Sequence, residues 1–263
     1  MRLLSLTTYP LKSGQGVSST DAIVTKTGLN YDRRWMLVDH SGQFMTARTH
    51  PRLLQLKAVP LAQDGHIRLQ FGDGNSLTAR PVSVGERRSV QVWSSATFGQ
   101  SFERSVNERL SAFLQTECAL VYMDDTIQRS ISNEDQRIVS YADGFPLLMT
   151  TQASLQALNR NIVPPVEMLV FRPNIVIDGQ TAFEERQWTR VRIGDVAFES
   201  GGDCVRCSLT TREPLTGIRR TDGQPLKALA ELQKQDNGVV FGINLIPLNE
   251  GIIRNGDAVV ALP

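Results

Sequence analysis

The sequence contains few cysteines and no long apolar run. Three cysteines occur in 263 residues, Cys118, Cys204 and Cys207. This small, odd number argues against a disulfide framework and favours a reducing, cytoplasmic compartment. No segment approaches the ~18 consecutive apolar residues of a membrane-spanning helix. The N-terminal segment predicts a first strand, because no apolar stretch there leads to a small-residue cleavage site. We therefore expect a cytoplasmic protein that does not enter a membrane.

The chain also lacks an excess of charge of either sign. It has 28 basic and 27 acidic residues, a net charge of +1, which gives no overall attraction to nucleic acid or to an anionic membrane. The hydrophobic share is 41%, with 20 glycines and 12 prolines, as in turn-rich globular proteins. A chain of this length can bury one large core or two modest ones without help from metals or disulfides.

Short apolar runs and turn residues alternate along most of the chain. From residue 1 to about residue 93 the pattern predicts strands that form a small barrel or curled sheet. Apolar residues at helical spacing predict an amphipathic helix over 102–115. A second helix is predicted from about 154 to 160, with Thr151 as its N-cap. Apolar, β-branched runs then return, so the predicted class is mixed α+β and mainly β.

The best candidate for a boundary is a polar stretch without apolar periodicity. It covers residues 124–137 and has the composition of a linker. We therefore predict two regions, residues 1–124 and residues 125–263.

One segment near the C-terminal end has the residues of a metal or redox site. Cys204 and Cys207 flank Arg206, and a fixed positive charge favours thiolate over thiol. Thiolates are soft ligands that suit zinc, copper(I), iron–sulfur clusters or an oxo metal. A single CxxC lacks the second ligand pair of a structural zinc site. From spacing alone, two small buried cysteines at the corner between a strand and a loop are an equal alternative.

A second signal is a set of cations at turns. Lys12 with Ser13, Arg33, and Arg172 stand beside glycine, proline or aromatic residues, where a charge and free backbone N–H groups can meet an anion. For each cation taken alone, solvated surface charge is the better interpretation. Taken together, they indicate an anionic ligand.

Two further segments offer polar contacts. Asn174 carries an amide that can hydrogen-bond a polar heterocycle, or it can complete a turn. The turn at residues 141–146 precedes an apolar run, and its backbone amides are candidates to line a pocket.

In this order, the segments resemble a known family. YPLKSGQG and GLNYDRRWMLVDHSGQFMTARTHPRLL are similar to the N-terminal β-barrel region of MOSC proteins, and YADGFPLL, FRPNIVI, RIGDVAF, CVRCSLTT and VVFGINLI are similar to the MOSC domain. The nearest resemblance is to the mitochondrial amidoxime-reducing components and to bacterial MOSC proteins that detoxify N-hydroxylated purines. The resemblance implies an N-terminal barrel-like β region (1–124) and a C-terminal MOSC β-barrel with attached helices (125–263).

The resemblance also implies a pyranopterin molybdenum cofactor in a cleft between the two regions. The second cysteine of the family's CxRC motif binds the metal, which is Cys207 here. The family's phosphate- and pterin-binding positions match Lys12, Ser13, Arg33 and Arg172. Its other cofactor-lining positions match Asn174, the backbone around Asp143 and Gly144, and Val205 with Arg206.

The activity implied is two-electron reduction of an N–O bond in hydroxylamines, amidoximes or N-hydroxylated bases. Some bacterial relatives continue into a plant-type ferredoxin domain, whereas no cysteine follows Cys207 here. We therefore expect a separate electron-donor protein, ferredoxin-like or a flavin reductase. Arg212 stands where an apolar residue is commoner in the reducing enzymes, which leaves the preferred substrate open.

Two other functions fit the same residues. MOSC domains also occur fused to pyridoxal-phosphate-dependent cofactor sulfurases, so Cys207 would carry a persulfide in a sulfur-carrier or cofactor-handling protein. The chain has no separate lysine-containing signature for pyridoxal phosphate, and we do not expect that cofactor to bind directly. The third function is a non-catalytic binding module with the same fold and an anion pocket.

Overall fold

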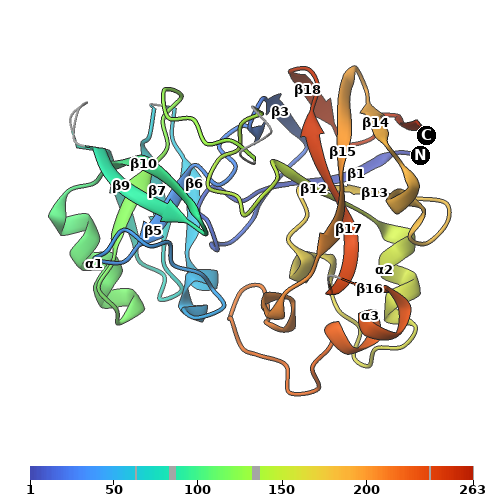
Figure 1. Ribbon diagram of the computed structural model, residues 1–263. Coiled ribbons are helices and arrows are strands. Elements are labelled where there is room, and N and C mark those ends of the chain that lie inside the picture. Colours follow the sequence, from blue (N-terminus) through green and yellow to red (C-terminus); the bar gives the residue numbers. More distant parts are fainter. Residues whose placement is uncertain (63, 83–86, 132–136, 237, 263) are drawn as a thin grey trace.

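The computed structural model describes residues 1–62, 64–82, 87–131, 137–236 and 238–262. Figure 1 shows two halves side by side, with most of the chain before residue 125 in one and the later chain in the other. None of the helices in these ranges is long and apolar enough to cross a membrane.

The largest sheet has nine strands and belongs mainly to the C-terminal half. Its path is β19–β14–β15–β17–β12–β13–β1–β2, and the short β16 pairs with β17. All neighbours pair antiparallel except β12 and β13, which are parallel. The bounds are β1 Leu3–Thr8, β2 Val17–Ser19, β12 Leu147–Thr151, β13 Ile175–Ile177, β14 Arg190–Ile193, β15 Val196–Val205, β16 Lys234–Gln235, β17 Gly238–Pro247 and β19 Val259–Leu262.

Three smaller sheets complete the strands. The orders are β5–β11–β10–β9, β18–β3–β4 and β6–β7–β8. The bounds are β3 Asp21–Thr25, β4 Gly28–Leu29, β5 Trp35–Val38, β6 Lys57–Pro60, β7 Ile67–Gln70, β8 Ser76–Ala79, β9 Arg87–Val92, β10 Ser95–Ser101, β11 Ala119–Tyr122 and β18 Gly251–Arg254.

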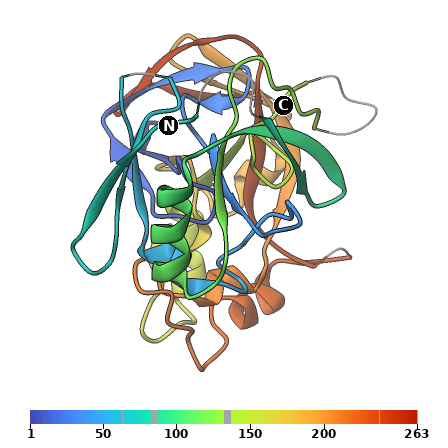
Figure 2. The ribbon, with the colours of Figure 1, turned by 90° about the vertical axis from the view of Figure 1, so that its left-hand side faces the viewer.

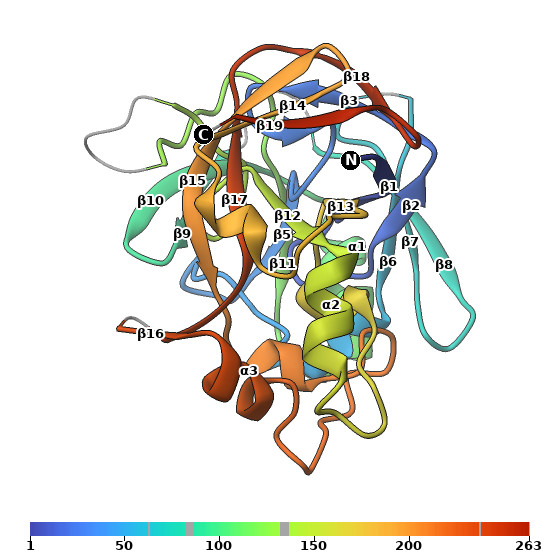
Figure 3. The same ribbon diagram turned by 90° about the vertical axis from the view of Figure 1, so that its right-hand side faces the viewer.

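Helices are short and lie outside the sheets. Figure 2 shows α1 beside the strands of the N-terminal half, and Figure 3 shows α2 and α3 beside the large sheet. The α-helices are α1 Arg104–Leu114, α2 Gln152–Asn159 and α3 Leu226–Leu232; the 3₁₀ helices are η1 Pro51–Gln55, η2 Met168–Phe171, η3 Glu184–Gln187 and η4 Ser208–Thr211.

Both predicted helices are present. In α1 the buried Val106, Leu110 and Leu114 recur every four residues, and the helix ends where Gln115 adopts a left-handed conformation (φ 57°). Helix α2 begins earlier than predicted, at residue 152. Its N-cap is Thr151, as expected, because the Thr151 side chain accepts a hydrogen bond from the backbone N–H of Ser154 at 3.0 Å.

The predicted class, mixed α+β and mainly β, is confirmed, but closed barrels are not found. Within the described residues each sheet is an open path, and β19 and β2 at the ends of the nine-stranded path do not pair with each other. Alternating apolar residues specify strands and their buried faces. They do not specify whether the two edges of a sheet meet.

The N-terminal strands cross the predicted boundary. Strand β1 pairs with β13, and β3 pairs with β18, so segments before residue 30 complete sheets formed by residues after 170. Two main apolar cores result, one among β5–β11 and α1 and one beneath the nine-stranded sheet. The division at residues 124 and 125 stays a prediction about domains, while the sheet itself joins both sides.

The polar stretch at 124–137 is more than a solvated linker, although its residues 132–136 lie outside the described ranges. Arg129 is buried, at 6% exposure. Its guanidinium donates to the carbonyl oxygen of Ser140 at 2.8 and 3.0 Å and also to that of Ala142. The stretch therefore supports the turn that follows it.

Candidate functional site

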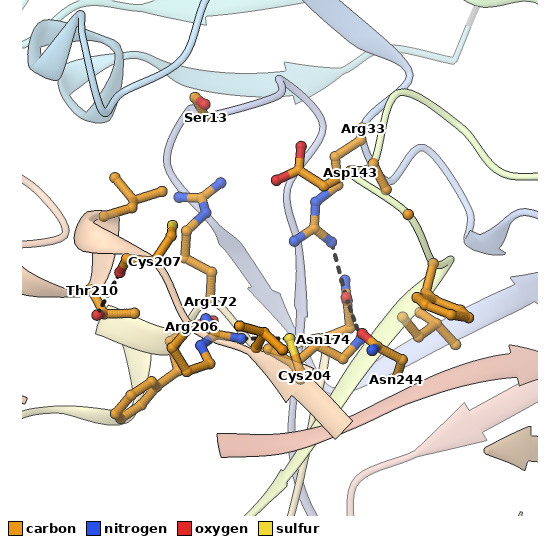
Figure 4. Close-up of a pocket in the computed structure, with 18 of the residues that line it drawn as sticks. Ser13, Arg33, Asp143, Arg172, Asn174, Cys204, Arg206, Cys207, Thr210 and Asn244 are labelled. Carbon is orange, nitrogen blue, oxygen red and sulfur yellow. Dashed lines mark hydrogen bonds between the residues drawn. The ribbon is translucent and has the colours of Figure 1, made fainter. Parts of the chain in front are cut away.

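All ten predicted site residues surround one cavity. It measures about 390 Å³ and is lined by residues from both halves of the chain. Figure 4 shows several of these side chains pointing toward a common space. The predicted residues around it are Lys12, Ser13, Arg33, Asp143, Gly144, Arg172, Asn174, Val205, Arg206 and Cys207.

Cys207 presents its thiol at this cavity. It follows strand β15 and is the N-cap of η4. Its carbonyl oxygen accepts hydrogen bonds from the backbone N–H of Thr210 at 3.1 Å and from the Thr210 hydroxyl at 2.9 Å, which hold the backbone in place (Figure 4). Cys207 is exposed and Cys204 is half-buried, so the interpretation as two buried cysteines is wrong.

Arg206 turns toward the other cysteine. Its guanidinium donates to the Cys204 sulfur at 2.8 Å and to the Phe171 carbonyl oxygen at 2.6 Å. Its buried Nε has no hydrogen-bond partner among the described residues. Since a buried donor without a partner is unfavourable, this nitrogen is a candidate for contact with a bound molecule.

Lys12 is buried, so the surface-charge interpretation is wrong for it. Its ammonium donates to the Tyr141 carbonyl oxygen at 2.7 Å and forms an ion pair with Asp143. Burial lowers the pKa of Lys12, against the opposing effect of Asp143. Desolvation disfavours the charged form of Asp143 too, but the Lys12 ammonium outweighs it and lowers the pKa of that carboxyl to about 2.

A buried carboxylate, Asp32, positions two predicted residues. It accepts hydrogen bonds from the Tyr9 backbone N–H at 2.8 Å and from the Asn174 side-chain amide at 2.9 Å, and it forms an ion pair with Arg33. The Arg33 guanidinium also donates to the Asn174 Oδ1 at 2.9 Å. Asn174 lies at the entrance of strand β13, where its Oδ1 accepts from the Leu148 N–H. Arg33 and Asn174 are therefore held by one network.

Two guanidinium groups lie over the Tyr9 ring. Arg33 Cζ lies 4.5 Å and Arg172 Cζ lies 4.2 Å from the ring centroid, which is cation–π geometry. Burial raises the pKa of Tyr9 to about 12 and lowers the pKa of Arg172 to about 10. Arg172 donates to the Gly14 carbonyl oxygen at 2.7 Å but makes no carboxylate ion pair within the described ranges.

Three predicted residues adopt left-handed backbone conformations. The φ angles are 65° for Ser13, 50° for Arg33 and 56° for Arg172. Such conformations are unfavourable for residues with a side chain and gather at functional sites. Here they turn two arginines and a serine toward the same cavity.

The turn after Tyr141 leaves backbone donors free. Arg129 and Lys12 hold the carbonyl oxygens of residues 140, 141 and 142. The N–H groups of Asp143, Gly144 and Phe145 have no acceptor among the described residues. Successive free N–H groups beside a cavity form an anion-binding surface, in accord with the prediction for the backbone around Asp143 and Gly144.

Sequence reasoning missed three residues that build this site. Asp32 stands within the YDRRW segment and Tyr9 within YPLKSG. Neither local pattern shows that Asp32 meets the Asn174 amide or that the Tyr9 ring meets Arg172, both from the other half. Arg129 lies in a stretch whose polar composition indicated a linker. Only their contacts in the folded chain reveal the roles of these residues, which stand behind the residues that line the cavity.

The residues present fit a metal that arrives inside an anionic organic cofactor. The described part of the chain holds no group of three His, Cys, Asp or Glu side chains that could bind a metal alone. A metal at this cavity would therefore bring most of its ligands with it, and Cys207 offers one soft thiolate. Arg172, Arg206 and the free amides of the 143–145 turn suit an anionic partner.

Comparison with known proteins identifies the family of the chain. The description "MOSC N-terminal beta barrel domain" matches residues 1–117, and "MOSC domain" matches residues 136–260. Mitochondrial amidoxime-reducing component 1 of Mus musculus is 30% identical over 274 residues, covering 97% of this chain and 80% of that protein. Mitochondrial amidoxime reducing component 2 of Homo sapiens is 31% identical over 270 residues, covering 95% and 80%.

A further relative has a different name. Molybdenum cofactor sulfurase of Oryza sativa subsp. japonica is 27% identical over 266 residues, which covers 93% of this chain and 32% of that protein. Matches to both domain descriptions in the expected order, together with relatives aligned over nearly the whole chain, show the family. The chain belongs to the MOSC family, in the group that joins an N-terminal MOSC β-barrel domain to a MOSC domain and includes the amidoxime-reducing components.

Proposed function

We propose that this protein is a molybdenum-cofactor-dependent oxidoreductase that reduces N-hydroxylated compounds. The observation that carries the proposal is the exposed thiol of Cys207 at a cavity lined by cationic side chains, in a chain whose relatives are named amidoxime-reducing components. The substrate classes are hydroxylamines, amidoximes and N-hydroxylated bases. A separate ferredoxin-like protein or flavin reductase supplies the electrons.

The chain's residues divide into two binding roles. Cys207 would bind the metal. Contacts to the anionic and heterocyclic parts of the cofactor would come from Lys12, Ser13, Arg33, Asp143, Gly144, Arg172, Asn174, Val205 and Arg206. When bound, the cofactor supplies the two-electron change that reductive cleavage of an N–O bond requires.

The protein also sets the electrostatic surroundings of the site. Asp32 keeps Arg33 and Asn174 in one orientation, and Arg129 keeps the amides of the 143–145 turn free. Charges and dipoles that are already oriented need no rearrangement when the ligand binds. Partial enclosure by both halves reduces access of water, which strengthens each of these interactions.

The first test is the molybdenum content of the purified protein. We expect near-stoichiometric molybdenum in wild type from a host that makes the cofactor, and loss of most of the metal in Cys207→Ala, because the thiolate ligand is removed. Mass spectrometry of the metal per chain measures both. The matched control is Cys118→Ala, since Cys118 is buried in the N-terminal core, and this variant should keep the metal.

Absence of molybdenum from wild type would contradict the proposal. A screen of amidoximes and hydroxylamines with a chemical electron donor then tests turnover by the metal-loaded protein. Failure to reduce any N-hydroxylated compound, with the metal in place, would also contradict it.

The second candidate is a sulfur-carrier or cofactor-handling protein with a persulfide on Cys207. Two observations favour it, the exposed thiol and the relative named molybdenum cofactor sulfurase. It predicts cyanide-labile sulfur on wild type, its absence in Cys207→Ala, and no turnover of N-hydroxylated compounds. A non-catalytic binding module would show neither labile sulfur nor turnover. Neither the carrier nor the binding module requires pyridoxal phosphate on this chain.

A further inference from the structure

Beside the cavity lies a group of flat side chains, one exposed and two half-buried, that the proposed function leaves without a role. It consists of Phe44, Arg48 and Trp93, here called the aromatic rim. The ring centroids of Phe44 and Trp93 are 5.0 Å apart, and Arg48 Cζ lies 4.6 Å from the Trp93 centroid. Trp93 is 46% exposed. Tryptophan is enriched at binding surfaces, where its ring supplies a large contact area.

Trp93 stands at a position where the backbone favours another residue. It is the first of two residues that join β9 to β10, since Val92 pairs with Ser95. Its φ is 56°, and glycine is the usual residue at the first position of a two-residue hairpin turn with this sign of φ. The turn itself therefore does not explain the tryptophan. Strain of this kind at a bulky residue is characteristic of functional positions.

The aromatic rim borders the cavity on the side of the 143–145 turn. The Trp93 side chain lies near enough to the Asp143 carboxylate to help lower the pKa of that carboxyl, and the Lys12 ammonium lies 5.2 Å from the Phe44 ring centroid. Asp143 and Lys12 both line the cavity. In Figure 1 the β9–β10 hairpin reaches from the N-terminal half toward the other half.

The rim is also joined to the loop that carries the thiol. The Arg212 guanidinium donates to the Arg48 carbonyl oxygen at 3.3 Å and to the Gly217 carbonyl oxygen at 2.9 Å. Arg212 directly follows η4, whose N-cap is Cys207. Figure 4 places Cys207 and Asp143 on different sides of Arg172. The segment from Phe44 to Arg48 thus connects the Asp143 side of the cavity with the Cys207 side.

We propose that the aromatic rim stacks the planar ring of an aromatic or heteroaromatic N-hydroxylated substrate and selects it over aliphatic ones. This inference rests on the proposed function and adds the class of substrate. Indole, phenyl and guanidinium faces all stack on flat conjugated rings. An alkyl group offers no such face, so its contact with the rim is weaker.

The test compares two substrates that share one reacting group. Benzamidoxime and acetamidoxime carry the amidoxime on a phenyl ring and on a methyl group. With the metal-loaded enzyme, kcat/KM is measured for both, and their ratio is the readout. In Trp93→Gly the ratio of benzamidoxime to acetamidoxime should fall about tenfold, mainly through KM for benzamidoxime, because about 1.4 kcal/mol of stacking corresponds to that factor.

Three controls separate stacking from folding. Glycine suits the turn, so Trp93→Gly should keep the wild-type melting temperature or raise it. Trp93→Phe keeps a ring, and its substrate ratio should stay within about threefold of wild type. Phe98→Ala removes another exposed aromatic side chain, 52% exposed, from the same hairpin, and it should leave the ratio unchanged.

An unchanged ratio in Trp93→Gly would overturn the inference. So would equal losses on both substrates with a raised KM for the electron-donor protein, which would make the rim a docking surface for that protein. If wild type reduces neither amidoxime, the proposed function fails by itself. Binding of benzamidoxime to the aromatic rim is then tested by quenching of tryptophan fluorescence in wild type and Trp93→Phe. Equal quenching in the two proteins would overturn the inference that the ring stacks on Trp93.

Discussion

At the scale of single residues, two neighbouring arginines, both largely buried, form ion pairs with carboxylates in opposite surroundings. Arg33 pairs with Asp32, and the two side chains are 15% and 0% exposed. Arg34 pairs with Asp125 at 2.7 Å, but the Asp125 side chain is 89% exposed. Removal of a buried carboxylate leaves its cation uncompensated. Water can replace a carboxylate that stands in solvent, and Arg34 keeps its hydrogen bond to the Met123 carbonyl oxygen.

We therefore predict that Asp32→Ala destabilises the fold by about 3 kcal/mol, and that Asp125→Ala changes it by at most about 0.5 kcal/mol. The free energy of unfolding in urea measures both. Asp32→Ala also deprives the Tyr9 N–H and the Asn174 amide of their acceptor. Equal, small losses in the two variants would show that Asp32 does not support the Arg33 side of the cavity.

At the scale of elements, a buried carboxylate joins helix α2 to η3. Glu185 is 0% exposed. Its two oxygens accept hydrogen bonds from the Ser154 hydroxyl at 2.8 and 3.0 Å, beside the Thr151 N-cap. No cation pairs with it among the described residues. Burial raises the pKa of Glu185 above its ordinary value of 4.5, despite these hydrogen bonds.

The stability should therefore depend on pH through this residue. Between pH 4.5 and the raised pKa of the folded state, Glu185 keeps a proton in the folded state that it releases in the unfolded state. The contribution of Glu185 to the free energy of unfolding is therefore complete below about pH 4.5 and is lost as pH rises through the folded pKa. Glu185→Gln should remove that decline. Urea unfolding at about pH 5, 6, 7 and 8 measures it, with Glu184→Gln as the neighbouring control. A decline of the same slope in wild type and Glu185→Gln would contradict the prediction.

At the scale of the whole molecule, the N-terminal strands are part of the C-terminal sheet. Strand β1 covers the edge of β13, and its Leu3 and Leu6 are buried in the core beneath that sheet. Residues 125–263 alone would expose this core and the β13 edge. We predict that this fragment unfolds without a cooperative transition, in contrast to the full chain. Thermal unfolding followed by circular dichroism tests it, and a sharp transition of the fragment would contradict it.

Much of the local structure could be predicted from the sequence. The spacing of Val106, Leu110 and Leu114 predicted α1, and Thr151, between an apolar run and the second helical segment, predicted the N-cap of α2. These features depend on residues within one or two turns of each other. The start of α2 was misplaced by two residues, because its first turn contains no large apolar residue before Leu155.

The sequence by itself predicted the residues that line the cavity: the cations Lys12, Arg33 and Arg172 from their turn contexts, and Cys207 from the family resemblance of its CxRC motif. Only the tertiary structure decided that they meet, that Cys204 takes the Arg206 guanidinium, and that Asp32 and Tyr9 support the arginines. Only the tertiary structure decided, too, that the edges of the sheets do not meet within the described residues. The physical reason is that pairing of β1 with β13 brings residues about 170 positions apart into contact, and such long-range pairing depends on the packing of the whole core, not on any local pattern.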